Sequence, residues 1–304
     1  MTRLNFKKTK HPLLLAIISL SWLVTPTLSS AQNNQTSLDG YCQEWAKKLR
    51  TVQYNGCKKL DLQAADIRSF ENRLLTFREF IPQTKEGESG EVIRPRGKIL
   101  FISGIHGDEY SAISITYLWM LAMVNNQHAL KHHWLFLPIA NPDGLFRSDP
   151  ATRTNARGVD MNRNFPSPDW DELALKYWQQ YTGKNERRYP GPHAASEIET
   201  QWLVDTIRRF QPDAIVSVHA PYGLLDYDGP EHAMPTKIGM LKHRELGTYP
   251  GSLGRYAGEY LGIPVLTLEL LSAGTMPKEG EIIKMWQDIE AWSNEKIQNP
   301  DRDF

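Results

Sequence analysis

The stretch KILFISGIHGDEYSAISITYLWMLAMV, residues 98–124, sets the fold of this chain. Residues 98–103 form a short apolar run typical of a buried strand, and residues 109–124 are apolar enough for a packed helix. His106 and Glu109 lie at the junction, three positions apart. From a strand end and a helix start, these two side chains can bind one Zn²⁺. Asp108 is either an alternative ligand or the N-cap of the helix.

The same strand–helix pattern continues along the chain. Asn141-Pro142-Asp143-Gly144 predicts a turn, and Ser196 with Glu199 predicts a capping box. Strands separated by helices predict an α/β fold with a mixed, mostly parallel central sheet and helices on both faces. We expect a strand or helix within 60–80, a hairpin or loop at 84–96, strands at 134–139, 214–218 and 265–270, and helices at 41–50, 170–181, 196–210 and 279–296.

Four polar side chains follow or end the predicted strands: His106, Asn141, His219 and Glu269. Ligands of open α/β sheets bind at this edge, so we expect the four to lie close together. Two histidines and one carboxylate leave a fourth coordination position open, as hydrolytic zinc sites do. Glu269 lies in an apolar run, which suits a general base, although an ion pair with an arginine is the alternative.

Residues 153–166, RTNARGVDMNRNFP, are rich in polar and basic side chains. Arg153 and Arg163 could bind a substrate carboxylate and stabilise a developing oxyanion. The alternative is a solvated loop whose arginines pair with Asp149 and Asp160.

Five short motifs together resemble the M14 zinc carboxypeptidases, in the family's order and with similar spacing. The resemblance covers about residues 98–272. The motifs are His-Gly-Asp-Glu (106–109), Asn-Pro-Asp-Gly (141–144), Gly-Val-Asp-Met-Asn-Arg-Asn-Phe (158–165), Ser-Val-His (217–219) and Thr-Leu-Glu-Leu (267–270).

The resemblance implies a role for each matching residue. His106, Glu109 and His219 look like the ligands of one zinc ion per chain. Glu269 looks like the general base that activates water, and Arg153 looks like the arginine that stabilises the oxyanion.

Substrate-binding residues follow from the same resemblance. Asn162 and Arg163 look like the pair that binds the substrate's C-terminal carboxylate. Tyr249 stands about where the family has a mobile catalytic tyrosine, although the interval to Glu269 is a little shorter than in the digestive enzymes. Candidates for reading a diaminopimelate side chain are Asp226, Asp228 and Arg255.

Within the family, the chain is more similar to the murein peptide amidase A branch. The similarity lies in His-Gly-Asp-Glu, in residues 219–230 and in Tyr-Pro-Gly-Ser (249–252). It implies hydrolysis of the γ-D-glutamyl–meso-diaminopimelate bond of murein peptides. The alternatives are a metallocarboxypeptidase acting on other exported peptides, a deacylase of the succinylglutamate desuccinylase or aspartoacylase type, and an inactive wall-binding domain. The Asn-Arg-Asn tripeptide and the predicted export signal argue against the deacylase, and the intact ligand set argues against the inactive domain.

The N-terminus predicts export. Residues 1–31 have a basic start, an apolar core at 13–24 and the small residues Ser29-Ser30-Ala31, which is typical of a cleaved signal peptide. The core falls short of the ~20 apolar residues of a membrane span, so we expect no span after cleavage and a periplasmic protein of a Gram-negative bacterium. We expect an N-terminal extension with the first elements at 32–97 and a catalytic domain at 98–304.

The balance of charged residues argues against a nucleic-acid partner. The chain has 35 basic and 35 acidic residues, and signal cleavage removes only basic ones, so no nucleic-acid partner is expected. The two cysteines, Cys42 and Cys57, should pair in an oxidising compartment. Closing a loop of ~15 residues contributes on the order of 3 kcal/mol.

Overall fold

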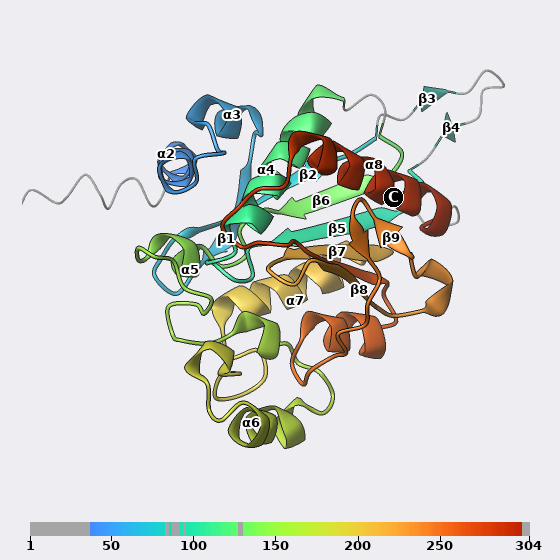
Figure 1. Cartoon of the computed structure of the whole chain (residues 1–304). Helices are drawn as coiled ribbons and strands as arrows, with labels where there is room; N and C mark the ends of the chain where they lie inside the picture. Colours follow the sequence, from blue (N-terminus) through green and yellow to red (C-terminus); the bar gives the residue numbers. More distant parts are fainter. Residues whose placement is uncertain (1–36, 83–84, 87–91, 94, 127–129, 300–304) are drawn as a thin grey trace, which may run out of the picture.

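The fold is built around a seven-stranded mixed sheet, seen in a computed structural model that describes residues 37–82, 85–86, 92–93, 95–126 and 130–299 (Figure 1). The strand order is β1-β2-β6-β5-β7-β11-β8, and neighbours among the four central strands β6, β5, β7 and β11 run parallel. The outer strands β1, β2 and β8 pair antiparallel. The predicted fold class is therefore confirmed. The sheet strands are β1 (Gln63–Arg68), β2 (Leu74–Phe80), β5 (Lys98–Ser103), β6 (His133–Leu137), β7 (Ala214–His219), β8 (Leu224–Asp228) and β11 (Val265–Glu269); two small pairs are β3 (Lys85–Glu86) with β4 (Val92–Ile93) and β9 (Lys237–Ile238) with β10 (Leu241–Lys242).

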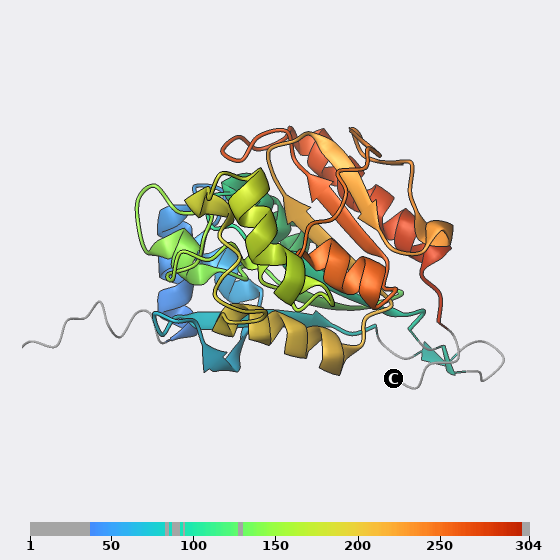
Figure 2. The ribbon, with the colours of Figure 1, turned by 90° about the horizontal axis from the view of Figure 1, so that it is seen from below.

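Helices cover both faces of the sheet, as Figures 1 and 2 show. One core packs α4 and α8 against the sheet, and a second core packs α7 and a π-helical segment against the other face. The helices are α2 (Leu38–Lys48), α3 (Tyr54–Lys59), α4 (Tyr110–Asn125), α5 (Pro142–Phe146), α6 (Trp170–Tyr181), α7 (Ile198–Phe210) and α8 (Glu279–Lys296), with the π-helical segment η5 (Gly254–Tyr260) and 3₁₀ turns at Met161–Arg163, Glu186–Arg188 and Glu231–Ala233.

The sequence explains why the central strands lie where they do. Residues 99–103 of β5 and all six residues of β7 are buried, because parallel strands are covered on both faces. In α7 the buried residues Trp202, Leu203, Ile207 and Phe210 recur at helical spacing and form the second core with the sheet.

Two local predictions were wrong. The helix α7 begins at Ile198 with Glu197 as N-cap, and no capping box forms. Ser196 instead donates to Glu197 Oε1 (2.6 Å), and Glu199 accepts from the Phe70 amide (3.0 Å), so tertiary contacts use both side chains. The stretch 141–144 is the start of the short helix α5 and not a simple turn, because Asn141 caps the Gly144 amide (2.8 Å) and proline suits the first helical position.

The N-terminal part joins the main fold. Strands β1 and β2 extend the central sheet, and α2 packs in the same core as α4. Cys42 on α2 and Cys57 on α3 form a disulfide with Cα atoms 5.6 Å apart. The predicted signal segment, residues 1–31, lies outside the described residues. Within the described part of the chain, no helix is both long enough and apolar enough to cross a bilayer.

Candidate metal centre and substrate pocket

The sheet places the predicted ligands on neighbouring strands. His106 follows β5, Glu109 immediately precedes α4, and His219 is the last residue of β7. Glu269 is the last residue of β11 and pairs in register with His219. Since β5, β7 and β11 are adjacent and parallel, their carboxyl ends bring these four side chains to one edge of the sheet. Of the four residues that the sequence predicts to lie close together, His106, His219 and Glu269 line one cavity, whereas Asn141 does not line it.

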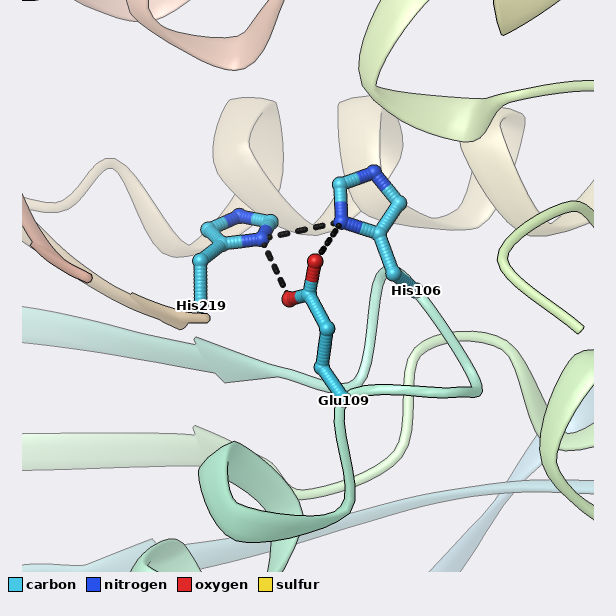
Figure 3. Close-up of side chains that lie close together, drawn as sticks. All are labelled: His106, Glu109 and His219. Atoms are coloured by element: carbon cyan, nitrogen blue, oxygen red, sulfur yellow. Dashed lines mark hydrogen bonds and ion pairs between the residues drawn. The ribbon is translucent and has the colours of Figure 1, made fainter. Parts of the chain in front are cut away.

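The three candidate ligands converge on one point (Figure 3). His106 Nδ1 lies 2.7 Å from Glu109 Oε1, and His219 Nδ1 lies 2.9 Å from Glu109 Oε2. The two Nδ1 atoms lie 3.1 Å apart. All three side chains are buried, and within the described residues they form the one histidine–carboxylate group close enough to hold a metal ion.

This donor set fits a zinc ion. Two imidazole nitrogens and one carboxylate are the ligands of catalytic zinc sites, with a further position left for water or substrate. The Nδ1 atoms of His106 and His219 face each other at 3.1 Å inside a buried site. This arrangement suits coordination of one shared cation better than a hydrogen bond between the two rings. Burial alone would raise the pKa of Glu109, but the facing histidines hold it well below its ordinary range, so the carboxylate is ionised as a ligand must be.

Asp160 orients the site from outside the ligand set. Its Oδ1 lies 3.0 Å from His106 Nε2, and its Oδ2 accepts from Arg153 Nε at 3.0 Å. Asp160 is fully buried, yet Arg153 and His106 keep its pKa below its ordinary range. A carboxylate on the outer nitrogen of a ligating histidine fixes the ring and its tautomer. The sequence had suggested Asp160 only as an ion-pair partner of arginine; its place two residues before the Asn162-Arg163 pair was the available signal.

Glu269 has one carboxylate oxygen without a hydrogen-bond partner among the described residues, and it lines the same cavity as the candidate ligands. The residue is 7% exposed, and the oxygen in question is Oε2. Burial raises the pKa of Glu269 above its ordinary value. Among the described residues no arginine lies within ion-pair distance, so the predicted alternative of an arginine pair is not formed. A buried, unpaired carboxylate beside a metal site can accept a proton from water.

Arg153 and Arg163 lie in the same cavity as the ligands, but in different settings. Arg153 is held by Asp160 and also lies 3.5 Å from Glu109 Oε1. The alternative prediction, that the arginines pair with Asp149 and Asp160, is confirmed for Asp160, which contacts Arg153. It is wrong for Asp149, which pairs with Lys48. Arg163 donates to the carbonyl of Asn162 (2.7 Å) and has no carboxylate within ion-pair distance among the described residues, which leaves its guanidinium available to a ligand.

Tyr249 lies against Arg163. The guanidinium carbon sits 4.3 Å from the ring centroid, and both residues line the cavity. Gly251 makes this approach possible: a Cβ there would lie 2.0 Å from the Arg163 carbonyl, and its φ of +79° favours glycine. The side chain of Asn162 accepts from the Leu253 amide (2.8 Å), which ties the same loop to the Asn162-Arg163 pair.

A close backbone approach and the side-chain hydrogen bonds of Asn141 hold the motifs together. A Cβ on Gly107 would lie 2.2 Å from the Gly144 carbonyl carbon, so the first two motifs pack directly. Asn141 donates to the carbonyls of Ile105 (3.2 Å) and Arg153 (3.3 Å). It does not line the cavity and braces the loops that carry His106 and Arg153. Asp108 neither caps α4 nor joins the ligands; it pairs with Arg187 at 2.6 Å.

The cavity continues from the ligands to an acidic wall on β8, with a volume of about 530 Å³. Asp226 and Asp228 both line it; Asp226 accepts from the Leu246 amide (3.0 Å), while Asp228 has no ion pair or hydrogen bond within the described residues. Burial and neighbouring Asp226 raise the pKa of Asp228 to about 7. Arg255 does not line the cavity, because Asp169 holds its guanidinium at 2.6 Å.

A sheet that gathers two histidines, a ligating carboxylate and a buried base at one edge defines a metal-dependent hydrolase of the α/β class. The family model described as zinc carboxypeptidase matches residues 62–228, more than half of the chain, and the chain therefore belongs to that family.

Similar proteins carry related names. The chain is 36% identical over 138 residues to murein peptide amidase A of Escherichia coli K12, covering 44% of this chain and 52% of the relative. It thus spans about half the length of that relative. Murein peptide amidase A of Vibrio campbellii is 29% identical over 180 residues, covering 56% of this chain and 68% of the relative.

Solved structures share the fold. The murein-tripeptide amidase of Escherichia coli O157 has a TM-score of 0.51 at 23% identity, covering 79% of this chain and 93% of that one. Carboxypeptidase A of Helicoverpa armigera has a TM-score of 0.59 at 19% identity, covering 84% of this chain and 71% of that one.

Proposed function

We propose that this protein is a zinc-dependent peptidase that hydrolyses the γ-D-glutamyl–meso-diaminopimelate bond of murein peptides. The names of the relatives support the substrate class. The observation that carries the proposal is the distribution of charge in one cavity. It holds a candidate ligand set, a buried carboxylate, and Arg163 and Asp228, neither of which forms an ion pair within the described part of the chain. Such a cavity suits a leaving residue that carries both a carboxylate and an ammonium group, as diaminopimelate does.

The residues divide the reaction between them. His106, Glu109 and His219 would hold a zinc ion, which would supply Lewis-acid activation of water and of the scissile carbonyl. Glu269 takes the proton from the attacking water and returns it to the leaving amine. Arg153 donates hydrogen bonds to the oxygen that becomes negative as the carbonyl is attacked.

The substrate is positioned at its leaving end. Arg163 and Asn162 bind the carboxylate next to the scissile amide, and Tyr249 closes against Arg163. Asp228 on β8 pairs with the ammonium group at the far end of the diaminopimelate side chain, with Asp226 as its neighbour on the same wall. Arg255 takes no part in this scheme, because Asp169 holds it.

The decisive experiment compares three substrates with purified protein, each with and without chelator. They are a murein tripeptide, a peptide with a C-terminal lysine, and acetyl-aspartate. We expect chelator-sensitive release of diaminopimelate from the tripeptide. Preferred cleavage of the lysine peptide supports a general basic carboxypeptidase, and cleavage of acetyl-aspartate alone supports a deacylase.

We further propose that the protein is exported to the periplasm. The disulfide between Cys42 and Cys57 suits an oxidising compartment. N-terminal sequencing of the protein from a periplasmic extract should begin at Gln32, after Ala31. Recovery of the full chain from the cytoplasm would contradict export and leave the hydrolase proposal standing.

A further inference from the structure

Two arginines that the proposed mechanism does not use lie at the mouth of the cavity. Arg187 and Arg188 are exposed, belong to the 3₁₀ turn Glu186–Arg188 between α6 and α7, and line the same cavity as the ligands. Both are more exposed than Arg163 and Asp228, which line the more buried walls of the cavity. The turn therefore adds positive charge at the open end of the cavity.

The turn is fixed to the catalytic part of the molecule. Asn185 caps it by accepting from the Arg187 amide (3.0 Å), and Trp178 of α6 donates to the Asn185 carbonyl (2.8 Å). The Tyr189 carbonyl accepts from the amide of Asp160 (2.8 Å), the residue that contacts His106 and Arg153. The position of the two arginines is thus set relative to the metal ligands.

Neither arginine is neutralised completely. Arg187 contacts Asp108 through one nitrogen (2.6 Å), yet 59% of its side chain stays exposed, so further N–H groups remain accessible. Across the described ranges, Arg188 has no carboxylate within ion-pair distance. Asp108 pairs with Arg187 alone, so the two guanidinium groups together keep net positive charge suited to an anion.

The substrate class supplies such an anion, and here the inference rests on the proposed function. A glutamyl residue linked through its γ-carbonyl keeps its α-carboxylate free, on the acyl side of the scissile amide. If the leaving residue occupies the inner walls at Arg163 and Asp228, the exposed end of the same cavity, where Arg187 and Arg188 lie, is the space open to the acyl side. We propose that Arg187 and Arg188 form an anion-binding subsite for this free carboxylate.

The test compares two tripeptides that differ only in this group, one with γ-D-glutamate and one with its α-amide, D-isoglutamine. Wild-type protein should favour the carboxylate peptide by about tenfold or more in kcat/KM, because charged hydrogen bonds are lost with the amide. The double variant Arg187→Gln/Arg188→Gln should raise KM for the carboxylate peptide with little change in kcat, and should lose the preference. Arg208→Gln, an exposed arginine on α7, serves as control and should keep it.

A binding measurement separates failure of this inference from failure of the proposed function. L-alanyl-D-glutamate and L-alanyl-D-isoglutamine are titrated into wild-type and double-variant protein by calorimetry. If only the wild type binds the glutamate dipeptide more tightly than the isoglutamine dipeptide, the subsite is supported. If neither tripeptide is cleaved, the proposed reaction is rejected, and the binding result still stands. Equal binding of both dipeptides, or a preference that survives in the double variant, overturns the subsite.

Discussion

At the scale of single residues, Asp160 has the most contacts to the reactive groups without being a ligand itself. It contacts His106 and Arg153 through its side chain and accepts from the Asn162 amide (3.0 Å). Because one buried carboxylate contacts the candidate ligand His106, Arg153 and the turn that carries Asn162, these three groups are positioned together. Changes at Asp160 should therefore weaken metal binding and catalysis at once.

We predict that Asp160→Asn lowers zinc affinity by about 10- to 100-fold, because His106 loses its charged acceptor. Competition with a chromophoric chelator measures this affinity directly. Asp171→Asn, an exposed change on α6, is the matched control and should bind zinc as the wild type does. Unchanged affinity in Asp160→Asn would show that the contact to His106 is not needed for binding.

Glu269→Gln should lower kcat by at least about 10²-fold, because the amide cannot accept the proton from water. Zinc content should stay at the wild-type level, since Glu269 is not one of the three ligands. Steady-state turnover of the tripeptide and metal analysis of the same sample test both points. Exposed Glu295→Gln is the control, and wild-type turnover by Glu269→Gln would remove Glu269 from the mechanism.

The sequence predicted that His106, Glu109 and His219 lie together, and the structure shows this. The prediction was possible because strong apolar runs mark the strands that end beside them, and the strand order places those strand ends side by side. It did not assign Asp160 a part in the site. Its importance depends on which side chains the fold brings within 3.0 Å, and His106 is 54 positions away. Arg255 shows the opposite error. The sequence suggested it as a substrate-binding residue, but its guanidinium pairs with Asp169 and does not line the cavity.

At the scale of elements, the bounds of β5, α6 and α8 agree with the sequence-based expectation because their apolar patterns are regular. Strand β8 was not predicted. Its sequence LLDYD puts Asp226 and Asp228 in a strand that is mostly buried, and acidic residues are depleted in strands. Pairing with β11 supplies the backbone bonds, and the cavity accommodates the carboxylates, so tertiary context overrides the local preference.

This strand should carry a measurable pH dependence. The folded-state pKa of Asp228 is about 7 against an ordinary 3.8, so between these values the folded protein binds more protons than the unfolded chain. Stability should therefore fall as pH rises from about 4 to 7, by on the order of 3 kcal/mol from this group. Asp228→Asn should flatten that fall and be the more stable protein at pH 8.

Urea unfolding at pH 5 and pH 8 measures the difference, with exposed Asp205→Asn as control. An equal loss of stability in wild type and Asp228→Asn would contradict the raised pKa. Substrate affinity should rise with pH while stability falls, because the substrate's ammonium group binds the ionised form of Asp228. KM should therefore decrease as pH rises through 7 in the wild type only.

The helices α2 and α3 depend on their disulfide and on the core beneath them. Trp45 packs edge-on against Tyr117 of α4 at 5.6 Å, and Tyr41 accepts from Thr76 of β2 (2.9 Å). Replacing both cysteines with serine should lower the free energy of unfolding by about 2–4 kcal/mol. Turnover should stay unchanged, because neither helix lines the cavity. A loss of turnover in a still-folded variant would show that this segment supports the site.

At the scale of the whole molecule, two apolar cores on opposite faces of the sheet hold the ligands in place. The ligands come from strand ends that backbone pairing and core packing already fix, so the site does not depend on metal for its formation. We therefore expect metal binding to add stability to a fold that can form without it, unlike small zinc domains that fold only with the ion.

Chelation should therefore lower the unfolding midpoint without unfolding the protein. At zinc concentrations about 1,000 times Kd, binding to the folded state alone adds roughly 4 kcal/mol. Thermal unfolding followed by circular dichroism, with chelator and with added zinc, measures the shift. His219→Ala should lose the zinc response because a ligand is gone, whereas exposed His232→Ala should keep it. If wild-type protein lost its secondary structure on chelation, the cores would not be sufficient to hold the strand ends; if zinc left its midpoint unchanged, the three converging side chains would not be a metal site.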